Sequence, residues 1–242
     1  MQRVLVGCPT YEGYDYCLAD YVRGVKNLTY KHYDAVLADN SKGDEYAKKI
    51  KEGGLGVVRG PHLSNVFERI VTSRNLLREK VLNERYDYFL SLEQDVIPPP
   101  HIIEQLMGHQ KDIVSGIYFK VYDIKVKDRD GFVKDKKAAL PLIFTFDEDP
   151  AKMNVCYPKD IEGNKFFQIR ACGLGGVLIH RRVLEKVKFR YDPNKNTFDD
   201  MHFCHDAIEN GFEIWADASI KCKHLFMKKG DVFGIVGKKL PM

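Results

Sequence analysis

The chain has 242 residues, of which 38 are Lys or Arg, 34 are Asp or Glu, and 44% are apolar. This composition excludes a disordered chain and predicts an α/β protein with an ordinary hydrophobic core, built as one large domain or two small ones. The formal charge of +4 neither requires nor excludes a nucleic-acid partner. No apolar run reaches the ~18 residues of a membrane span, and the apolar start is too short for a signal peptide, so we expect a cytoplasmic protein.

Predicted strands and helices alternate along the first half of the chain. Short β-branched apolar runs predict strands at 3–8, 33–38, 55–58, 86–92 and 112–119. Apolar residues at steps of three and four predict helices at 15–25, 44–51, 64–83 and 101–108. Ser64 is the expected N-cap of the third helix. This alternation predicts a mostly parallel sheet with helices on both faces.

The pattern changes after residue 119. Residues 120–165 are rich in Lys and Asp, and they contain the hairpin signal Asp130-Gly131 and the apolar run 140–146. We expect a smaller antiparallel section here. Helices follow, and their predicted ranges are 181–187 and 200–210.

A Lys-rich tail, 227–242, ends the sequence and allows two interpretations. Its lysines and the apolar residues Phe233 and Ile235 are compatible with a peripheral contact to an anionic membrane surface. A solvated tail is the simpler alternative.

The six cysteines are scattered and form no C-x-x-C pair. This arrangement predicts buried free thiols in a reducing compartment. Zinc ligand types occur at His202, Cys204, His205, Cys222 and His224, but their spacings match no structural zinc pattern. We therefore favour free thiols over a zinc site.

Polar segments follow three predicted strands at their carboxyl ends, where parallel α/β sheets bind ligands. They are Pro9-Thr10-Tyr11-Glu12, Asp39-Asn40-Ser41 and Glu93-Gln94-Asp95. The carboxylates of Glu93 and Asp95 are two residues apart, so both can face one hard divalent ion such as Mg²⁺ or Mn²⁺. An acidic turn before the next helix is the alternative.

These segments, in this order, resemble the GT-A glycosyltransferases, and in particular the large inverting family 2 of bacterial and archaeal sugar transferases. Strand 86–92 with Glu93-Gln94-Asp95 resembles the family's D-x-D element, although Glu93 replaces its first Asp. The other matching segments are Pro9-Thr10-Tyr11, Asp39-Asn40-Ser41, Ser73-Arg74-Asn75, Gly173-Leu174-Gly175-Gly176, Asp199-Asp200 and Lys223-His224. The resemblance covers residues 3–119 and 168–226, and Asp199 replaces a Glu that is usual in the family.

The resemblance implies a GT-A fold and a metal-dependent, inverting transfer of a sugar from a nucleotide-diphospho-sugar to an acceptor hydroxyl. The acceptor is a glycan, a lipid-linked molecule or a protein, and no nucleic acid takes part. Residues 1–242 then form a single domain with a nucleotide-binding half, 1–119, and an acceptor-side half, 120–226, before the basic tail.

The resemblance also assigns roles to residues. Asp200, with Asp199 beside it, is the catalytic base, and Asp95 and His224 hold Mn²⁺ or Mg²⁺. The residues assigned to the nucleotide-sugar are Pro9, Tyr11, Glu12, Asp39, Asn40, Arg74, Glu93, Gln94, Gly175 and Gly176.

Simpler alternatives remain for the assigned residues and for the whole chain. Asp199 or Asp200 can be a plain helix N-cap, and Tyr11 can be a surface aromatic at the sheet edge. A sugar-phosphate nucleotidyltransferase is the rival enzyme, although Pro9-Thr10-Tyr11-Glu12 replaces the Gly-rich segment expected there. A nucleotide- or sugar-binding module without catalysis is the third interpretation, and the two acid replacements favour it.

Overall fold

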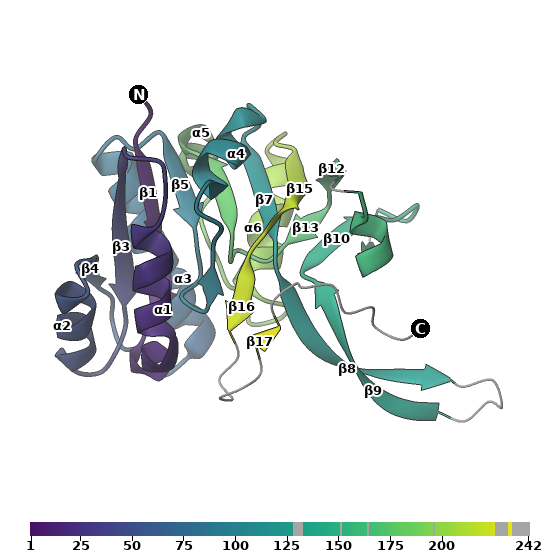
Figure 1. The fold of residues 1–242 in the computed structure, drawn as a ribbon, viewed down its shortest axis with the longest axis horizontal. Helices are drawn as coiled ribbons and strands as arrows, with labels where there is room; N and C mark the ends of the chain where they lie inside the picture. Colours follow the sequence, from purple (N-terminus) through teal and green to yellow (C-terminus); the bar gives the residue numbers. More distant parts are fainter. Residues whose placement is uncertain (128–132, 151, 164, 196, 226–231, 234–242) are drawn as a thin grey trace.

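One large mixed sheet organises the protein (Figure 1). The computed structural model describes residues 1–127, 133–150, 152–163, 165–195, 197–225 and 232–233. Within them, the sheet has nine strands in the order β12-β15-β7-β14-β5-β1-β3-β2, with β4 paired to β3. Their bounds are β1 Val4–Gly7, β2 Pro9–Thr10, β3 Tyr33–Asp39, β4 Gly56–Arg59, β5 Tyr88–Ser91, β7 Ile113–Ile117, β12 Phe166–Ile169, β14 Val177–His180 and β15 Ile214–Lys221.

Most neighbouring strands in this sheet run parallel, as the sequence predicts. Antiparallel pairs occur only where β14 lies between β5 and β7, and where β12 pairs with β15, in the part of the chain the structure describes. The registers place Gly7 of β1 beside Ser91 of β5, and Thr10 of β2 beside Asp39 of β3. The carboxyl ends of these strands therefore lie along one edge of the sheet.

Helices cover both faces of the sheet because successive side chains of each strand point to opposite faces. In β1, Leu5 packs into one hydrophobic cluster, whereas Val4 and Val6 pack into another. The helices α3 (Val66–Asn83), α5 (Arg181–Lys186) and α6 (Asp199–Glu209) contribute to the Leu5 cluster. The other cluster contains buried residues of α1 (Asp15–Lys26), α2 (Glu45–Glu52) and α4 (Ile102–Gly108).

The predicted N-cap of the helix at 64–83 is wrong, and side-chain hydrogen bonds explain the difference. The N-cap of α3 is Asn65 rather than Ser64, because its side chain accepts hydrogen bonds from the backbone amides of Phe67 and Glu68. The apolar run 140–146 is divided between β9 (Val133–Pro141) and β10 (Ile143–Phe146). Between them, the backbone amide of Leu142 donates to the carbonyl of Tyr118 at 3.0 Å.

The antiparallel section predicted after residue 119 is confirmed. Strand β8 (Phe119–Lys127) pairs with β9, and this hairpin projects away from the main sheet (Figure 1). Strand β10 pairs with β11 (Met153–Val155) and β13 (Ala171–Cys172), and the short 3-10 helix η2 (Pro158–Ile161) follows β11. A third small sheet contains β6 (Val96–Ile97), β16 (Lys223–Leu225) and β17 (Val232–Phe233).

Some sequence predictions fall outside the described residues. These are the turn at Asp130-Gly131 and most of the basic tail, so the membrane-contact interpretation stays a prediction. All six cysteines are buried and free, which confirms the prediction of unpaired thiols. No helix in the described ranges is long and apolar enough to cross a membrane.

Tyr118 fixes how the hairpin meets the main sheet. Its side chain is buried, and its hydroxyl accepts a hydrogen bond from the backbone amide of Gly175 at 3.2 Å. A Cβ atom on Gly175 would lie 2.7 Å from Cζ of the Tyr118 ring, and one on Gly173 would collide with the Tyr118 hydroxyl and Leu142. Glycine is therefore required here by the ring of Tyr118.

Replacing Gly175 by Ala is expected to destabilise the protein by about 1–3 kcal/mol, because the buried ring must move to admit the methyl group. Urea unfolding measures the change. Gly108→Ala is the matched control, since a Cβ there would have no neighbour within 4 Å. Equal unfolding midpoints for the two variants would contradict the packing argument.

Candidate functional site

Arg74, on α3, joins several polar segments at the carboxyl edge of the sheet. Its guanidinium group is buried and donates to a carboxylate oxygen of Asp199. It also donates to the hydroxyl of Ser91 at 3.1 Å and to the carboxylate of Glu93 at 2.9 Å. Burial alone would lower the pKa of Arg74, but Asp199 and Glu93 raise it above its usual value. The charged guanidinium therefore holds the end of β5 against the start of α6.

Asp199 and Asp200, in the first turn of α6, differ in their surroundings. Neither acid is the N-cap of the helix, because Phe198 occupies that position. The Asp199 carboxylate points to Arg74, whereas Asp200 makes no ion pair among the described residues. Burial, together with the charge of Asp199, raises the pKa of Asp200 to about 6. Of these two neighbouring acids, Asp200 is therefore the one whose pKa lies closer to neutral pH.

Glu93 sits between Arg74 and the other acids. Its side chain is 34% exposed, so solvent still reaches it. Partial burial raises the pKa of Glu93 above its usual value, with Arg74 acting in the opposite direction and Asp95 adding to the rise. The carboxylates of Asp95, Asp199 and Asp200 all disfavour the ionised form of Glu93, and the buried Arg74 offsets part of this repulsion.

Asp95 and His224 face each other although they lie far apart in the sequence. Asp95 follows β5 and His224 belongs to β16, and the Nε2 of His224 is 3.3 Å from Oδ2 of Asp95. The Nδ1 of His224 is 2.8 Å from the carbonyl oxygen of Phe119. Because a carbonyl only accepts, Nδ1 carries a hydrogen and Nε2 is turned towards Asp95. Burial alone would lower the pKa of His224, but Asp95 raises it overall.

This pair fits a divalent cation that also binds phosphate. No group of three or more His, Cys, Asp or Glu side chains in the described ranges is arranged to hold a metal. However, Mg²⁺ and related ions in phosphate-binding sites take only one or two protein carboxylates and keep water and phosphate oxygens as further ligands. A histidine whose other N–H donates to a backbone carbonyl is the usual arrangement of a metal-binding imidazole.

Asp39 is the last residue of β3 and Asn40 follows it, and the side chains of both are buried and contact their neighbours. Asp39 accepts hydrogen bonds from the amide and the hydroxyl of Ser41, at 3.0 and 2.6 Å, and forms an ion pair with Arg59. The side-chain nitrogen of Asn40 donates to Ser73 at 3.1 Å. The Oδ1 atom of Asn40 is buried and has no hydrogen-bond partner. The segment therefore presents a fixed backbone at the sheet edge.

Tyr11 and Glu12 lie beside Arg69 and His62, which the sequence analysis did not identify. The guanidinium carbon of Arg69 is 5.5 Å from the centre of the Tyr11 ring. His62 contacts the Asn40 carbonyl at 3.1 Å and Arg69 at 3.5 Å. The hydrogen bond from Ser41 lowers the pKa of Glu12. The missed signal was positional, because Gly60-Pro61-His62 follows β4 just as the three recognised segments follow their strands.

Four other residues that the resemblance assigns to the nucleotide-sugar pack against other parts of the protein. Gln94 is buried and hydrogen-bonds to Thr10, Tyr46 and the carbonyl of Tyr14. Pro9 pairs with β3. Gly175 lies against Tyr118, and a Cβ on Gly176 would be 3.3 Å from the sulfur of Cys222. These residues shape the edge of the sheet, and their contact with a donor stays a prediction.

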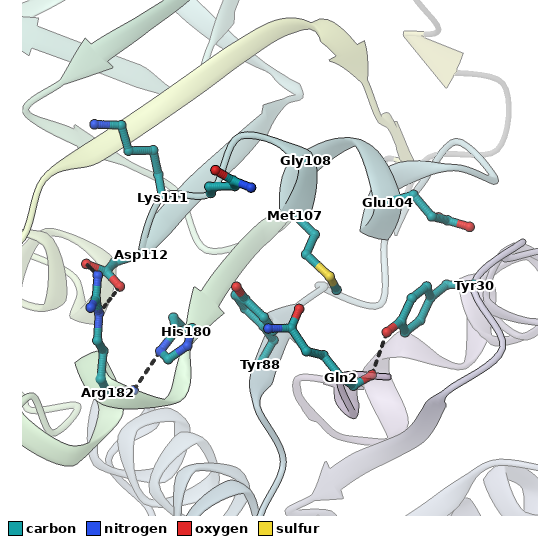
Figure 2. A pocket seen from close by; sticks show the side chains of 11 residues that line it. Gln2, Tyr30, Tyr88, Glu104, Met107, Gly108, Lys111, Asp112, His180 and Arg182 are labelled. Atoms are coloured by element: carbon teal, nitrogen blue, oxygen red, sulfur yellow. Dashed lines mark hydrogen bonds and ion pairs between the residues drawn. The ribbon is translucent and has the colours of Figure 1, made fainter.

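A separate pocket of about 560 Å³ lies at the opposite, amino edge of the sheet (Figure 2). Tyr88 at the start of β5, Asp112 before β7, and His180 and Arg182 line it. Asp112 and Arg182 form an ion pair with each other, and the His180 ring packs edge-on against Tyr88 at 4.8 Å. The predicted site residues all lie elsewhere, so the candidate site is the carboxyl edge.

Comparisons with known proteins agree with this fold. The sequence matches no protein-family model and no curated protein. One similar solved structure is A197 from STIV, at 18% identity and a TM-score of 0.51, covering 93% of this chain and 86% of that one. Another is GalNAc-T7 with UDP, GalNAc and Mn²⁺, at 12% identity and a TM-score of 0.62, covering 93% of this chain and 44% of that one. GalNAc-T7 is a GT-A glycosyltransferase, so the protein has a GT-A-like fold.

Removing the buried guanidinium group of Arg74 should destabilise the folded protein. Arg74→Ala leaves Asp199 and Glu93 without their cation, and we expect a loss of about 3–5 kcal/mol in the free energy of unfolding. Urea denaturation measures this loss. Arg182→Ala is the control, because Arg182 is 63% exposed in its ion pair with Asp112 and should contribute little. Similar losses for both variants would show that Arg74 is no more than a surface cation.

Proposed function

We propose that this protein is a divalent-cation-dependent, inverting glycosyltransferase that moves a sugar from a nucleotide-diphospho-sugar to an acceptor hydroxyl. The main support for the proposal is the arrangement of acids at one edge of a GT-A-like sheet. Arg74 holds Asp199, Asp200 is left without an ion pair among the described residues, and Asp95 faces His224. The UDP and Mn²⁺ in the GalNAc-T7 structure support this donor class and this cation.

On the donor side, the chain must bind a nucleotide and accommodate the charge of its diphosphate. Asp95 and His224 would hold Mn²⁺ or Mg²⁺, which supplies Lewis-acid stabilisation of the leaving diphosphate when it is bound. Tyr11 offers an aromatic face to the base, and Arg69 lies within 5.5 Å of that ring. Asp39 and Asn40 fix the backbone beside it.

On the acceptor side, Asp200 is the base. The acceptor oxygen forms a bond to the anomeric carbon as the bond from that carbon to the diphosphate oxygen breaks. The hydroxyl proton passes to the Asp200 carboxylate, and the electron pair of the broken bond leaves with the diphosphate. A base whose pKa is about 6 is mostly ionised at neutral pH and is still a useful proton acceptor.

Two features favour this function over the alternatives. A nucleotidyltransferase would be expected to have a Gly-rich phosphate loop after β1, where this chain has Pro9-Thr10-Tyr11-Glu12. A binding module without catalysis has no need for an acid such as Asp200, whose ionised form is disfavoured by its surroundings. Perturbed carboxyl groups of this kind concentrate at catalytic sites.

Nucleotide binding tests the cation site. We expect calorimetry with UDP and other nucleoside diphosphates to show binding that depends on Mn²⁺. Asp95→Ala should weaken it by about 10–100-fold, because half of the protein's donor set is lost. Asp20→Ala is the control, since Asp20 lies on α1 in an exposed ion pair with Arg23. Nucleotide binding that persists unchanged in EDTA would overturn the metal assignment.

Replacing the base tests catalysis separately from binding. Asp200→Asn should lower sugar transfer by about 10²–10⁴-fold while nucleotide binding is kept. In the unchanged protein, transfer should rise with pH through about 6, because only the ionised carboxylate accepts the proton.

Stability provides the folding control for this variant. The pKa of Asp200 is higher in the folded protein than its ordinary value of 3.8, so its ionisation costs stability as the pH rises from about 4 through about 6. Asp200→Asn removes that cost, and its thermal midpoint at pH 7 should equal or exceed that of the unchanged protein. Normal transfer by Asp200→Asn would refute its role as base.

A further inference from the structure

Gln94 lies between two acids in the sequence, yet only 1% of it is exposed. The hydroxyl of Thr10 donates to Oε1 of Gln94, and Nε2 of Gln94 donates to the backbone carbonyl of Tyr14 at 2.9 Å. The hydroxyl of Tyr46 is 3.0 Å from Oε1 and 2.6 Å from Nε2. The side-chain amide of Gln94 therefore contacts three other segments, which are β2, the 3-10 helix η1 (Glu12–Tyr14) and α2.

These contacts hold the amide in one orientation. The carbonyl of Tyr14 only accepts, so the NH₂ group of Gln94 must face it and Oε1 must face Thr10. Both polar atoms of the amide are then hydrogen-bonded within the protein. The burial of Gln94 is therefore accounted for without a contact to a nucleotide-sugar.

Gln94 and Asp95 are the two central residues of a turn. The backbone amide of Val96 donates to the carbonyl of Glu93 at 2.9 Å and closes this turn. Anchoring the Gln94 side chain therefore restrains the peptide that leads into Asp95. On its other side, the carbonyl of Asp95 accepts from the backbone amide of Leu225 in β16 at 2.6 Å. The backbone of Asp95 is thus held at both ends.

The position of Asp95 matters because its carboxylate faces His224. Oδ2 of Asp95 is 3.3 Å from Nε2 of His224, and the imidazole is itself held by the carbonyl of Phe119. Mg²⁺ demands near-ideal octahedral geometry, so both protein ligands must keep their relative positions. The hydrogen bond to Phe119 holds the histidine, and the side chain of Gln94 is the matching restraint on the turn that carries the acid.

We propose that Gln94 is a positioning residue for the cation site, which holds Asp95 opposite His224 and makes no contact with the donor. This inference rests on the proposed function, because that function assigns the cation to Asp95 and His224. It replaces the direct donor contact that the resemblance assigns to Gln94.

Titration of the full chain with Mn²⁺ alone, followed by electron paramagnetic resonance, tests the inference without a nucleotide. Asp95→Ala identifies the part of the binding that belongs to this site. Gln94→Met keeps the length of the side chain but removes both polar atoms. It should weaken the Asp95-dependent binding of Mn²⁺ about tenfold, because the turn is no longer anchored. Unchanged Mn²⁺ affinity in Gln94→Met would overturn the proposal.

A second variant reaches Gln94 from a distance and keeps the core packed. Tyr46 is 3% exposed, and Tyr46→Phe removes only the hydroxyl that contacts Gln94. We expect about threefold weaker Mn²⁺ binding, as for the loss of one hydrogen bond. Tyr33→Phe is the matched control, because the Tyr33 hydroxyl donates to the carbonyl of Val25 at 2.8 Å. Equal Mn²⁺ affinities in these two variants would assign the Gln94 contacts to stability alone and contradict the positioning role.

UDP binding separates positioning from direct contact. A positioning defect lowers the affinity for the cation, so saturating Mn²⁺ should restore UDP binding by Gln94→Met to that of the unchanged protein. UDP binding that stays weak at saturating Mn²⁺ would show that Gln94 contacts the donor, and it would overturn the proposal.

The outcomes distinguish failure of this inference from failure of the proposed function. A protein whose Mn²⁺ affinity depends on Asp95 and Gln94, but which transfers no sugar, would keep the positioning role and lose the transferase assignment. A protein that transfers sugar with Mn²⁺, but binds the ion normally in Gln94→Met, would keep the transferase assignment and lose the positioning role. Absence of Asp95-dependent Mn²⁺ binding would overturn the inference together with the metal assignment.

Discussion

Two carboxylates and a hydroxyl, from the end of β5 and the start of α6, converge on one buried cation, the guanidinium of Arg74. A guanidinium group suits this position because it stays charged when buried and has several donors in a fixed plane. Asp199 and Glu93 could not approach each other so closely without it, since their charges repel in a region of low dielectric. The positions of β5, α3 and α6 relative to one another thus depend on this contact.

The ion pair with Arg74 also gives neighbouring acids different surroundings. Asp199 is directed towards Arg74, and its neighbour Asp200 keeps a raised pKa without an ion pair in the described part of the chain. Asp95 is directed instead towards His224, whose tautomer is fixed by the carbonyl of Phe119. Asp199 and Asp95 have different partners and Asp200 has no ion pair among the described residues, and the proposed roles of base and metal ligand follow from these surroundings rather than from residue type.

The sheet edge also illustrates why glycines near a site need not contact a ligand. The Gly-Leu-Gly-Gly segment suggests close approach of a sugar, but Gly173 and Gly175 lie against the ring of Tyr118. Gln94, which stands between two acids in the sequence, is directed inward to Thr10 and Tyr46. In both cases the local sequence marks the edge correctly, but which group each residue packs against depends on residues more than 40 positions away.

The sequence by itself determined the α/β class, the order of the elements and the edge where the polar segments lie, because these depend on local periodicity and on the parallel alternation of strands and helices. It also singled out Asp95, Asp200 and His224 as candidates. Only the tertiary structure decided that Arg74 is buried, that His62 and Arg69 lie beside Tyr11, and that Gln94 is held by three other segments. These outcomes depend on contacts between distant segments, and the burial and charge of a side chain are set by such contacts rather than by its neighbours in sequence.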